Sequence, residues 1–325
     1  MSRPRLGFLG VGWIGRHRME AMLATGAIEA AMISDASPDM AVEAAKLAPG
    51  AEVVAGLADM RGLDGVVIAT PSALHAEQSI VALEAGSAVF CQKPLGRDTG
   101  EATRVVAAAR AADRLLSVDF SYRYSAGMQA IAALLRDRAL GRVFAVDLVF
   151  HNAYGPDKPW FYDRVQSGGG CVMDLGVHLV DLALWALGWP TVAEVDAHLV
   201  AGGQPLTGDA VEDFAAAAIT LADGTTVRLA CSWRLNAGVD AEIGARFYGT
   251  EGGAALRNVG GSFYDLIAEQ YRGTAAEPLG GGMDSDWGTR AAADWARRLA
   301  AGEGFDPAAN HLIDVSRVLD RIYAR

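Results

Sequence analysis

Lysine is the scarcest charged residue in this chain. Of 325 residues 28 are basic, but only Lys46, Lys93 and Lys158 are lysines, and all the others are arginines. Acidic residues number 39, so the net charge is −11. An acidic surface repels polyphosphate, which argues against nucleic acid as a main partner. Because the chain otherwise uses Arg for positive charge, each lysine is a candidate for a special role.

Cysteine is also scarce, and every long apolar stretch is interrupted. Cys91, Cys171 and Cys231 lie far apart and form no Cys-x-x-Cys pattern, so they predict no disulfide framework and fit a reducing compartment. Glycines break the N-terminal apolar segment, which does not match a secretory signal. The most apolar stretch, residues 171–189, contains charged side chains, which argues against a membrane span. We expect a cytoplasmic protein without membrane contact.

The chain is rich in hydrophobic residues, and its short apolar runs alternate regularly with helical patterns. Hydrophobic residues make up 51%, enough for the cores of two domains. Short apolar runs alternate with Ala-rich helical patterns up to residue 120, which predicts a doubly wound parallel sheet in a domain spanning 1–120. The predicted strands are 5–10, 29–34, 52–54, 65–70, 87–92 and 115–118, and the predicted helices are 13–25, 38–47, 73–85 and 99–113.

The pattern changes after residue 120, where strands follow one another without helices between them. This predicts an α+β domain over 121–325 with an open, mainly antiparallel sheet, and its last helix is able to pack back on the first domain. We expect helices at 126–138, 171–187, 287–301 and 307–323, strands at 142–152, 192–201, 210–222, 225–236 and 241–249, and loops at 153–169 and 280–286.

A glycine fingerprint lies between the first predicted strand and helix. The run Gly10-Val11-Gly12-Trp13-Ile14-Gly15 is a G-x-G-x-x-G, in which the glycines permit a tight turn, close approach of backbone to a pyrophosphate, and close strand–helix packing. In this context the motif predicts dinucleotide binding, with Trp13 and Ile14 beside the cofactor.

Asp35 indicates which dinucleotide is bound. It lies just past the second strand, where a carboxylate accepts hydrogen bonds from ribose hydroxyls and repels a 2′-phosphate. No Arg follows in the next three positions, so we expect NAD rather than NADP. The alternative is that Asp35 caps the next helix, a role for which Ser37 competes.

Three further segments carry a family resemblance. They are Thr70-Pro71-Ser72-Ala73-Leu74-His75, Gln92-Lys93-Pro94-Leu95, and residues 167–181, which read SGGGCVMDLGVHLVD. With the glycine fingerprint they resemble, in order and spacing along the whole chain, the glucose–fructose oxidoreductase / inositol dehydrogenase (Gfo/Idh/MocA) family. The resemblance implies a Rossmann domain joined to an α/β domain with an open sheet. It also implies NAD(P)-dependent oxidation or reduction of sugars, inositols and related polyols, and dimers or tetramers built through that sheet.

The resemblance also assigns residues. It implies that Lys93, Asp174 and His178 are catalytic and contact substrate. It places Thr70, Pro71, His75, Gln92, Lys93 and Arg123 at the cofactor. One departure is Gln92, which stands where most relatives have Glu. Gln keeps the hydrogen bonding but lacks the charge that would stabilise the Lys93 ammonium.

The chemistry of these residues can be argued without the family. Asp174 and His178 stand at i and i+4, on one face of a helix. His suits the removal of a hydroxyl proton, and a carboxylate nearby can orient the ring. Lys93 follows a buried strand at the carboxyl end of the sheet, where such folds bind ligands. The structural alternatives are a helix with a polar face and a lysine that merely reaches solvent.

The remaining candidates are substrate contacts. The segment 151–162 mixes hydrogen-bonding groups with aromatic faces, as sugar sites do, and it contributes Asn152 and Trp160; Tyr122 is expected near the nicotinamide or substrate. The alternative is that this segment is only a packed lid. Asp174, His178 and Asp181 on one helix stripe would ligate zinc poorly, so no metal is expected.

The sequence therefore predicts an NAD-dependent sugar or polyol oxidoreductase, acting in either direction. Two alternatives remain: a redox-assisted glycoside hydrolase that uses NAD catalytically, and a regulator that binds the dinucleotide without catalysis.

Overall fold

The computed structural model describes residues 2–325, which form two compact units. The first unit contains the chain up to Asp119 and the returning segment Thr289–Asp314. The second contains Phe120–Gly288 and Val315–Arg325.

The first unit is built on a six-stranded parallel sheet in the order β3-β2-β1-β4-β5-β6. This is the dinucleotide-binding Rossmann order, and it agrees with the predicted doubly wound sheet. The short apolar runs form the strands, and the side chains of β4 and β5 are buried throughout. The strands are β1 (Arg5–Leu9), β2 (Glu29–Ser34), β3 (Glu52–Val53), β4 (Gly65–Ile68), β5 (Ala88–Cys91) and β6 (Leu116–Val118), and the helices are α1 (Trp13–Ala24), α2 (Pro38–Ala45), α3 (Ser72–Glu84) and α4 (Thr99–Ala112).

A segment from near the C-terminus completes this unit. It carries α8 (Arg290–Ala300), whose Trp295 is buried and lies 5.8 Å from the Phe90 ring of β5. A Cβ at Gly65 would lie 2.8 Å from the Trp295 ring, so this glycine makes room for the indole. The returning helix is thus α8, whereas the end of α9 (His311–Ile322) belongs to the second unit.

The second unit contains a nine-stranded mixed sheet in the order β15-β14-β13-β12-β7-β11-β10-β8-β9. Neighbouring strands are antiparallel except β7 and β11, which are parallel. The strands are β7 (Val143–Asn152), β8 (Val192–Ala201), β9 (Gln204–Pro205), β10 (Phe214–Leu221), β11 (Thr226–Ser232), β12 (Ala241–Gly249), β13 (Gly253–Asn258), β14 (Leu266–Arg272) and β15 (Ala275–Asp284).

Four of these strands, β9 and β13 to β15, were not predicted, and one prediction was wrong. Residues 280–286 were expected to be a loop, but most of them lie in β15. Gly280, Gly281 and Gly282 have φ between +72° and +102°, and the pairing of β14 with β15 shifts register at this place. The glycines therefore form an irregularity within a strand, a use of glycine that a sequence pattern does not separate from a turn.

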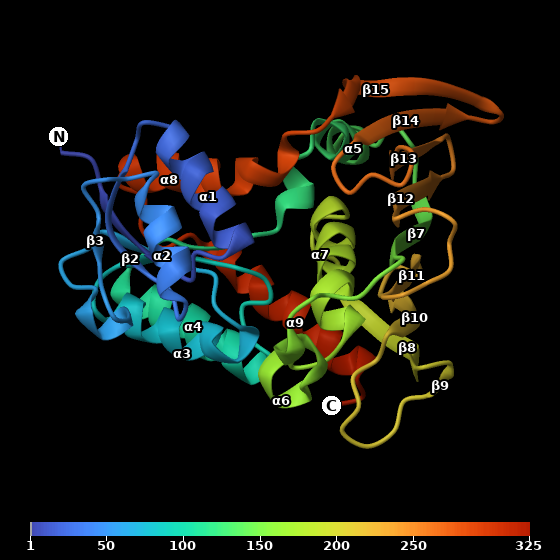
Figure 1. Ribbon diagram of the computed structural model, residues 1–325. Helices are drawn as coiled ribbons and strands as arrows, with labels where there is room; N and C mark the ends of the chain where they lie inside the picture. The colour runs from blue at the N-terminus through green and yellow to red at the C-terminus, as the bar shows by residue number, and fades with distance from the viewer. Residues whose placement is uncertain (1) are drawn as a thin grey trace. The chain divides into compact units, whose positions relative to one another are not determined.

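Two helices pack against one face of this sheet: α5 (Ala126–Arg136) on β13–β15, and α7 (Val177–Ala186) on β7 and β11 (Figure 1). A π-helical turn, Val172–Gly176, leads into α7. By length and composition Arg164–Ala186 could cross a membrane, but 83% of its apolar window is buried inside the protein, as in a core helix. Cys171 and Cys231, far apart in sequence, come together with 3.8 Å between their Sγ atoms.

Candidate cofactor and catalytic sites

The glycine fingerprint forms the turn between β1 and α1. Gly10 has φ +83°, and a Cβ there would lie 2.6 Å from the carbonyl of Ala69. A Cβ at Gly15 would overlap the carbonyl oxygen of Gly10. Gly12 is the N-cap of α1, whose first amide groups have no partner earlier in the helix. A turn that tolerates no side chain at two of its glycines, with a helix N-terminus behind it, fits a pyrophosphate.

Asp35 lies against this turn. Its Oδ2 accepts a hydrogen bond from Val11 N at 2.7 Å, and its Oδ1 accepts one from Ser37 N at 2.8 Å. The carboxylate therefore lies beside the fingerprint and also bonds the residue that precedes α2, so both interpretations of Asp35 describe part of its geometry. A fixed negative charge at this place repels a 2′-phosphate.

The other predicted cofactor residues of the first unit lie on α1 and after β4. Trp13 is exposed, with its ring 4.5 Å from that of His17, and Ile14 is half-buried. Thr70 Oγ1 donates to Gln78 Oε1 at 2.6 Å, and Pro71 caps the start of α3. Thr70 and Pro71 thus occupy the carboxyl end of β4, the edge at which parallel sheets bind ligands.

His75 connects two loops. Its buried ring lies between Pro94 O, at 2.6 Å from Nδ1, and Thr70 O, at 2.7 Å from Nε2. Burial lowers the pKa of this imidazole, against the opposing effect of both carbonyl contacts. The ring therefore joins the loop after β4 to the loop after β5 through their backbones.

Lys93 is the one residue of Ala88–Gly96 that is not fully buried. Gln92 before it is buried and donates from Nε2 to Asp119 Oδ2, and Pro94 after it bonds His75 through its carbonyl. The lysine side chain is thus the exposed part of a buried segment.

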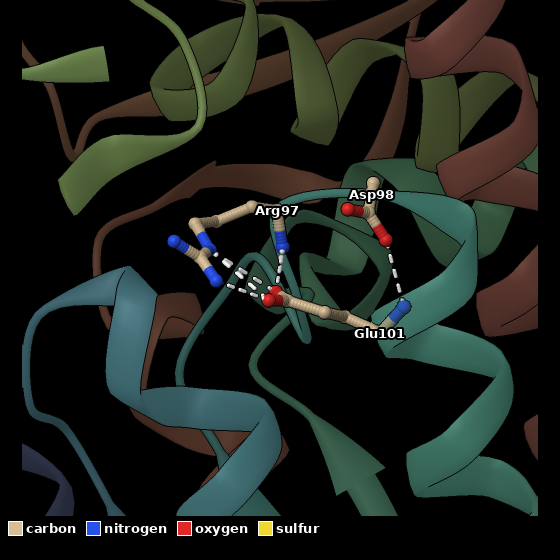
Figure 2. A network of polar contacts seen from close by, with 3 residues as sticks. All are labelled: Arg97, Asp98 and Glu101. Carbon is tan, nitrogen blue, oxygen red and sulfur yellow. Dashed lines mark hydrogen bonds and ion pairs between the residues drawn. The ribbon is translucent and has the colours of Figure 1, made fainter. Parts of the chain in front are cut away.

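The chain that leaves Lys93 enters α4 through a compact polar network (Figure 2). Glu101 accepts hydrogen bonds from the backbone N–H and the guanidinium of Arg97, while Asp98 Oδ1 accepts from Glu101 N at 2.7 Å. This capping arrangement satisfies the amide of Glu101 in the first turn of the helix and that of Arg97 before it, and fixes where the loop ends.

In the second unit, Asp174 and His178 are partly exposed residues of a buried helix, just as Lys93 is the partly exposed residue of a buried segment. Between Cys171 and Leu184 these two are the residues that are not fully buried. Asp174 lies in the π-helical turn and His178 in the first turn of α7. π-Helical turns are rare and occur often at functional sites.

The start of this helix is held by a buried carboxylate, that of Glu212. Glu212 accepts hydrogen bonds from Gly170 N and Val172 N at 3.0 and 2.9 Å, and from the Tyr323 hydroxyl at 2.7 Å. Burial raises the pKa of Glu212, and these donors oppose the effect. A Cβ at Gly170 would overlap Glu212 O, so the glycine run lets the carboxylate reach the helix.

Asp174 connects to a group of aromatic side chains. Its Oδ2 accepts a hydrogen bond from the Trp233 indole at 3.0 Å, and the Trp233 ring meets those of Phe161 and Tyr162 edge-on. The ring of Trp160 stacks on Phe161 at 3.8 Å. The predicted sugar-binding segment is therefore in contact with the residue that bonds Asp174.

His178 is surrounded by rings. Its imidazole lies 5.2 Å from Tyr122, 6.2 Å from Phe120 and 6.5 Å from Phe150, and it borders a small, mainly apolar cavity. Burial raises the pKa of Tyr122, with Asp174 as a second cause. Tyr122 thus lies next to His178, as a neutral phenol.

Arg123 is engaged within its own unit. It forms a two-bond ion pair with the buried Asp181, and its guanidinium lies over the rings of Phe120, Trp185 and Trp189. Burial raises the pKa of Asp181, and Arg123 opposes it. Asp181 is therefore committed to this pair.

Asn152 ends β7 with a buried amide oxygen. Among the described residues, nothing donates a hydrogen bond to its Oδ1. A ligand hydroxyl is a suitable donor for such an atom.

Residues 2–325 contain no group of three or more His, Cys, Asp or Glu side chains placed to hold a metal ion.

Three residues of these sites were missed by the sequence analysis: Asp119, Glu212 and Trp233. Each stands at the start or end of a strand, and each pairs with a residue at least 27 positions away. Trp233 lay inside the strand predicted at 225–236, and only the structure shows that it follows the strand end. The two acids gave no local signal of burial.

Comparison with known proteins agrees with both units. Residues 5–120 match the model of an oxidoreductase family with an NAD-binding Rossmann fold, and residues 128–255 match the GFO/IDH/MocA C-terminal domain. A 1,5-anhydro-D-fructose reductase of Ensifer adhaerens is 30% identical, over 78% of this chain and 76% of its own. An inositol 2-dehydrogenase of Rhizobium meliloti (strain 1021) is 28% identical, over 78% and 76%.

A solved structure extends the similarity to the whole chain. The structure of GenD2 from gentamicin A biosynthesis, in complex with NAD, has a TM-score of 0.82 and 26% identity, covering 100% of this chain and 94% of its own.

Proposed function

The chain belongs to the GFO/IDH/MocA family of NAD-binding oxidoreductases, and on that premise we propose that it moves a hydride between nicotinamide and a hydroxyl-bearing carbon of a sugar, inositol or related polyol. The observation that carries this proposal is the exposure pattern of two buried segments. Lys93 in one, and Asp174 with His178 in the other, are the side chains that reach solvent. Three polar groups exposed from otherwise buried backbone are placed to act on a ligand.

We assign the roles as follows. NAD, when bound, supplies the acceptor of the hydride. His178 takes the hydroxyl proton, a step for which a histidine imidazole is a common acceptor. Lys93 hydrogen-bonds the reacting oxygen. Asp174, oriented by the Trp233 indole, positions His178 or the substrate.

Substrate recognition is assigned to the second unit. The unmatched oxygen of Asn152 would accept from a sugar hydroxyl, and the ring of Trp160 offers a face of the kind on which sugar rings pack. Tyr122 lines the site beside His178. Cofactor contacts are assigned to Gly10, Gly12, Trp13, Ile14, Gly15, Asp35, Thr70 and Pro71, with His75 and Gln92 holding the neighbouring loops through the contacts described above. Arg123 is assigned to the cofactor by the family resemblance, since its contacts described above lie within the second unit.

We also propose which cofactor the protein prefers, how its copies assemble and where it is located. The fixed charge of Asp35 beside the glycine turn favours NAD over NADP. The helices of the second unit pack against one face of its sheet, which leaves the other face to pair with a second copy in a dimer or tetramer. We place the protein in the cytoplasm, in keeping with its three free cysteines.

The test is titration with NAD and NADP, followed by a panel of sugars and polyols in which NADH is read from its absorbance. We expect tighter binding of NAD and NADH formation from at least one substrate. His178→Ala should lower kcat by about 100-fold or more, because the proton acceptor is lost. A variant with full activity would refute the role of His178. Turnover without accumulation of NADH would instead indicate glycoside cleavage.

A further inference from the structure

Lys93 lies between Gln92 and Pro94, and each of these two residues contacts a buried polar side chain. On one side, the Gln92 amide donates to Asp119, and the Gln92 backbone N–H donates to Ile68 O at 2.8 Å. On the other side, the Pro94 carbonyl contacts His75. The position of the Lys93 backbone is therefore set by its neighbours, while its own side chain is half-exposed.

The group that holds Gln92, the residue before Lys93, is the carboxylate of Asp119, which is only 1% exposed. Asp119 Oδ2 accepts hydrogen bonds from both Gln92 Nε2 and Arg18 Nε, the latter at 2.6 Å. Its backbone N–H donates to Cys91 O at 3.0 Å. One oxygen thus joins the ends of β5 and β6 to α1, the helix that follows the glycine turn.

We propose that Asp119 is a positioning residue for Lys93, and that Gln92 and Asp119 are an interdependent pair in which one side chain must be an amide and the other a carboxylate. This inference rests on the role proposed above for Lys93. The pair explains the departure at position 92: a Glu there would place a second carboxylate in hydrogen-bonding contact with Asp119.

The charges in this cluster support the pairing. Arg18 and Asp119 are both buried and compensate each other, and the neutral Gln92 adds a donor without adding charge. Two adjacent buried carboxylates cannot both ionise without a large cost, and one Arg cannot offset both. The double variant Gln92→Glu with Asp119→Asn exchanges the two groups. It keeps one carboxylate, one amide and one Arg in the cluster.

The first experiment is thermal unfolding of four proteins: the parent, Q92E, D119N and the exchanged double variant. We expect each single variant to lose on the order of 5 °C in Tm, and the double variant to regain most of it. The matched control is Glu43→Gln, which removes a carboxylate from an exposed pair with Lys46. A Q92E protein as stable as the parent would overturn the interdependence.

The second experiment reports on Lys93 itself, without any substrate. Because the chain has only three lysines, reductive ¹³C-methylation gives three lysine NMR signals, of which Lys46 and Lys158 are internal standards. We expect D119N to shift the Lys93 signal and leave the other two in place, and the double variant to restore it. If D119N does not fold, the double variant carries the test. An unmoved Lys93 signal in D119N, or an unrestored one in the double variant, contradicts the positioning role.

A third readout connects the pair to turnover. Once a substrate is known, D119N should lower kcat about tenfold or more with KM within about twofold, because displacement of a catalytic group affects the chemical step. Exchange in the double variant should recover it. Failure to find any NADH-forming substrate would refute the proposed function, but the melting and NMR results would still decide whether Asp119 positions Lys93.

Discussion

Single residues matter most in the glycine turn and in the buried polar contacts. At Gly15 a side chain would meet backbone rather than a movable group, so the constraint cannot be relaxed by a rotamer change. His151 is a different case. It is buried on β7, its Nδ1 lies 2.9 Å from Ser232 Oγ, and its ring is stacked on Phe214. Each residue gives a test confined to one side chain.

Gly15→Ala should abolish measurable NAD binding and cost about 1–3 kcal/mol of stability, because the added Cβ overlaps the Gly10 carbonyl. Gly56→Ala is the matched control, since a Cβ there meets nothing within 4 Å and φ is −177°. Calorimetric titration with NAD and a melting curve would measure both effects. Equal NAD affinity in the two variants would contradict this account of the turn.

Stability should fall with acidification partly through His151. Burial lowers the pKa of His151 from its usual 6.5, and Glu242 opposes the effect. The unfolded chain therefore takes up this proton before the folded one does. The stabilising contribution is complete above pH 6.5 and is lost as pH falls through the lower folded pKa. Urea unfolding of His151→Gln and parent, between about pH 7.5 and pH 5, should give a shallower decline for the variant. Parallel declines would exclude His151 as a contributor.

At the scale of elements, the segment Cys171–Ala186 is the one on which the candidate chemistry depends. The sequence predicted this helix, its polar residues and the i, i+4 spacing, because all of these are local. It could not predict the π-helical turn, or that Glu212 before β10 and Trp233 after β11 contact it. For the same reason the first sheet was predicted almost strand by strand, whereas β9, β13, β14 and β15 were missed. Their pairing is set by neighbours rather than by their own periodicity.

Removing the carboxylate at the start of this helix should be costly. Glu212→Ala leaves the amides of Gly170 and Val172 without their acceptor in a buried place, and we expect a loss of about 2–4 kcal/mol in the free energy of unfolding. Tyr323→Phe removes one donor and keeps the carboxylate, so about 1 kcal/mol is expected. Chemical denaturation would measure both. A Tyr323 variant that loses as much as Glu212→Ala would show that the hydroxyl, not the amide contacts, dominates.

At the scale of the molecule, the large sheet of the second unit has one face that its helices do not use. Side chains on β7 alternate: Val146, Leu148 and Phe150 are buried on one side, while Asp147 and Val149 belong to the other. Val149 pairs with Gly244 of the neighbouring strand, which carries no side chain to cover it. Partly exposed apolar side chains on a sheet face are suited to association of identical copies.

The dimer or tetramer proposed above should dissociate into smaller species in Val149→Arg, with the Tm of the variant within a few degrees of the parent. The matched control is Val81→Arg on the exposed side of α3. Analytical ultracentrifugation over a range of concentrations would measure both. An unchanged assembly in Val149→Arg would place the contact between copies elsewhere.

The return of Thr289–Asp314 to the first unit has a consequence for biosynthesis. The N-terminal sheet emerges from the ribosome early, but Trp295, which packs beside Phe90 and over Gly65, is translated only after almost the whole second unit. Until then the apolar surface that Trp295 covers is open to solvent and to other nascent chains. A fragment ending near residue 120 would keep that surface permanently, so it should aggregate or bind chaperones even though its sheet is complete in sequence. Supplying residues 289–314 after the fragment by a short linker should restore its solubility.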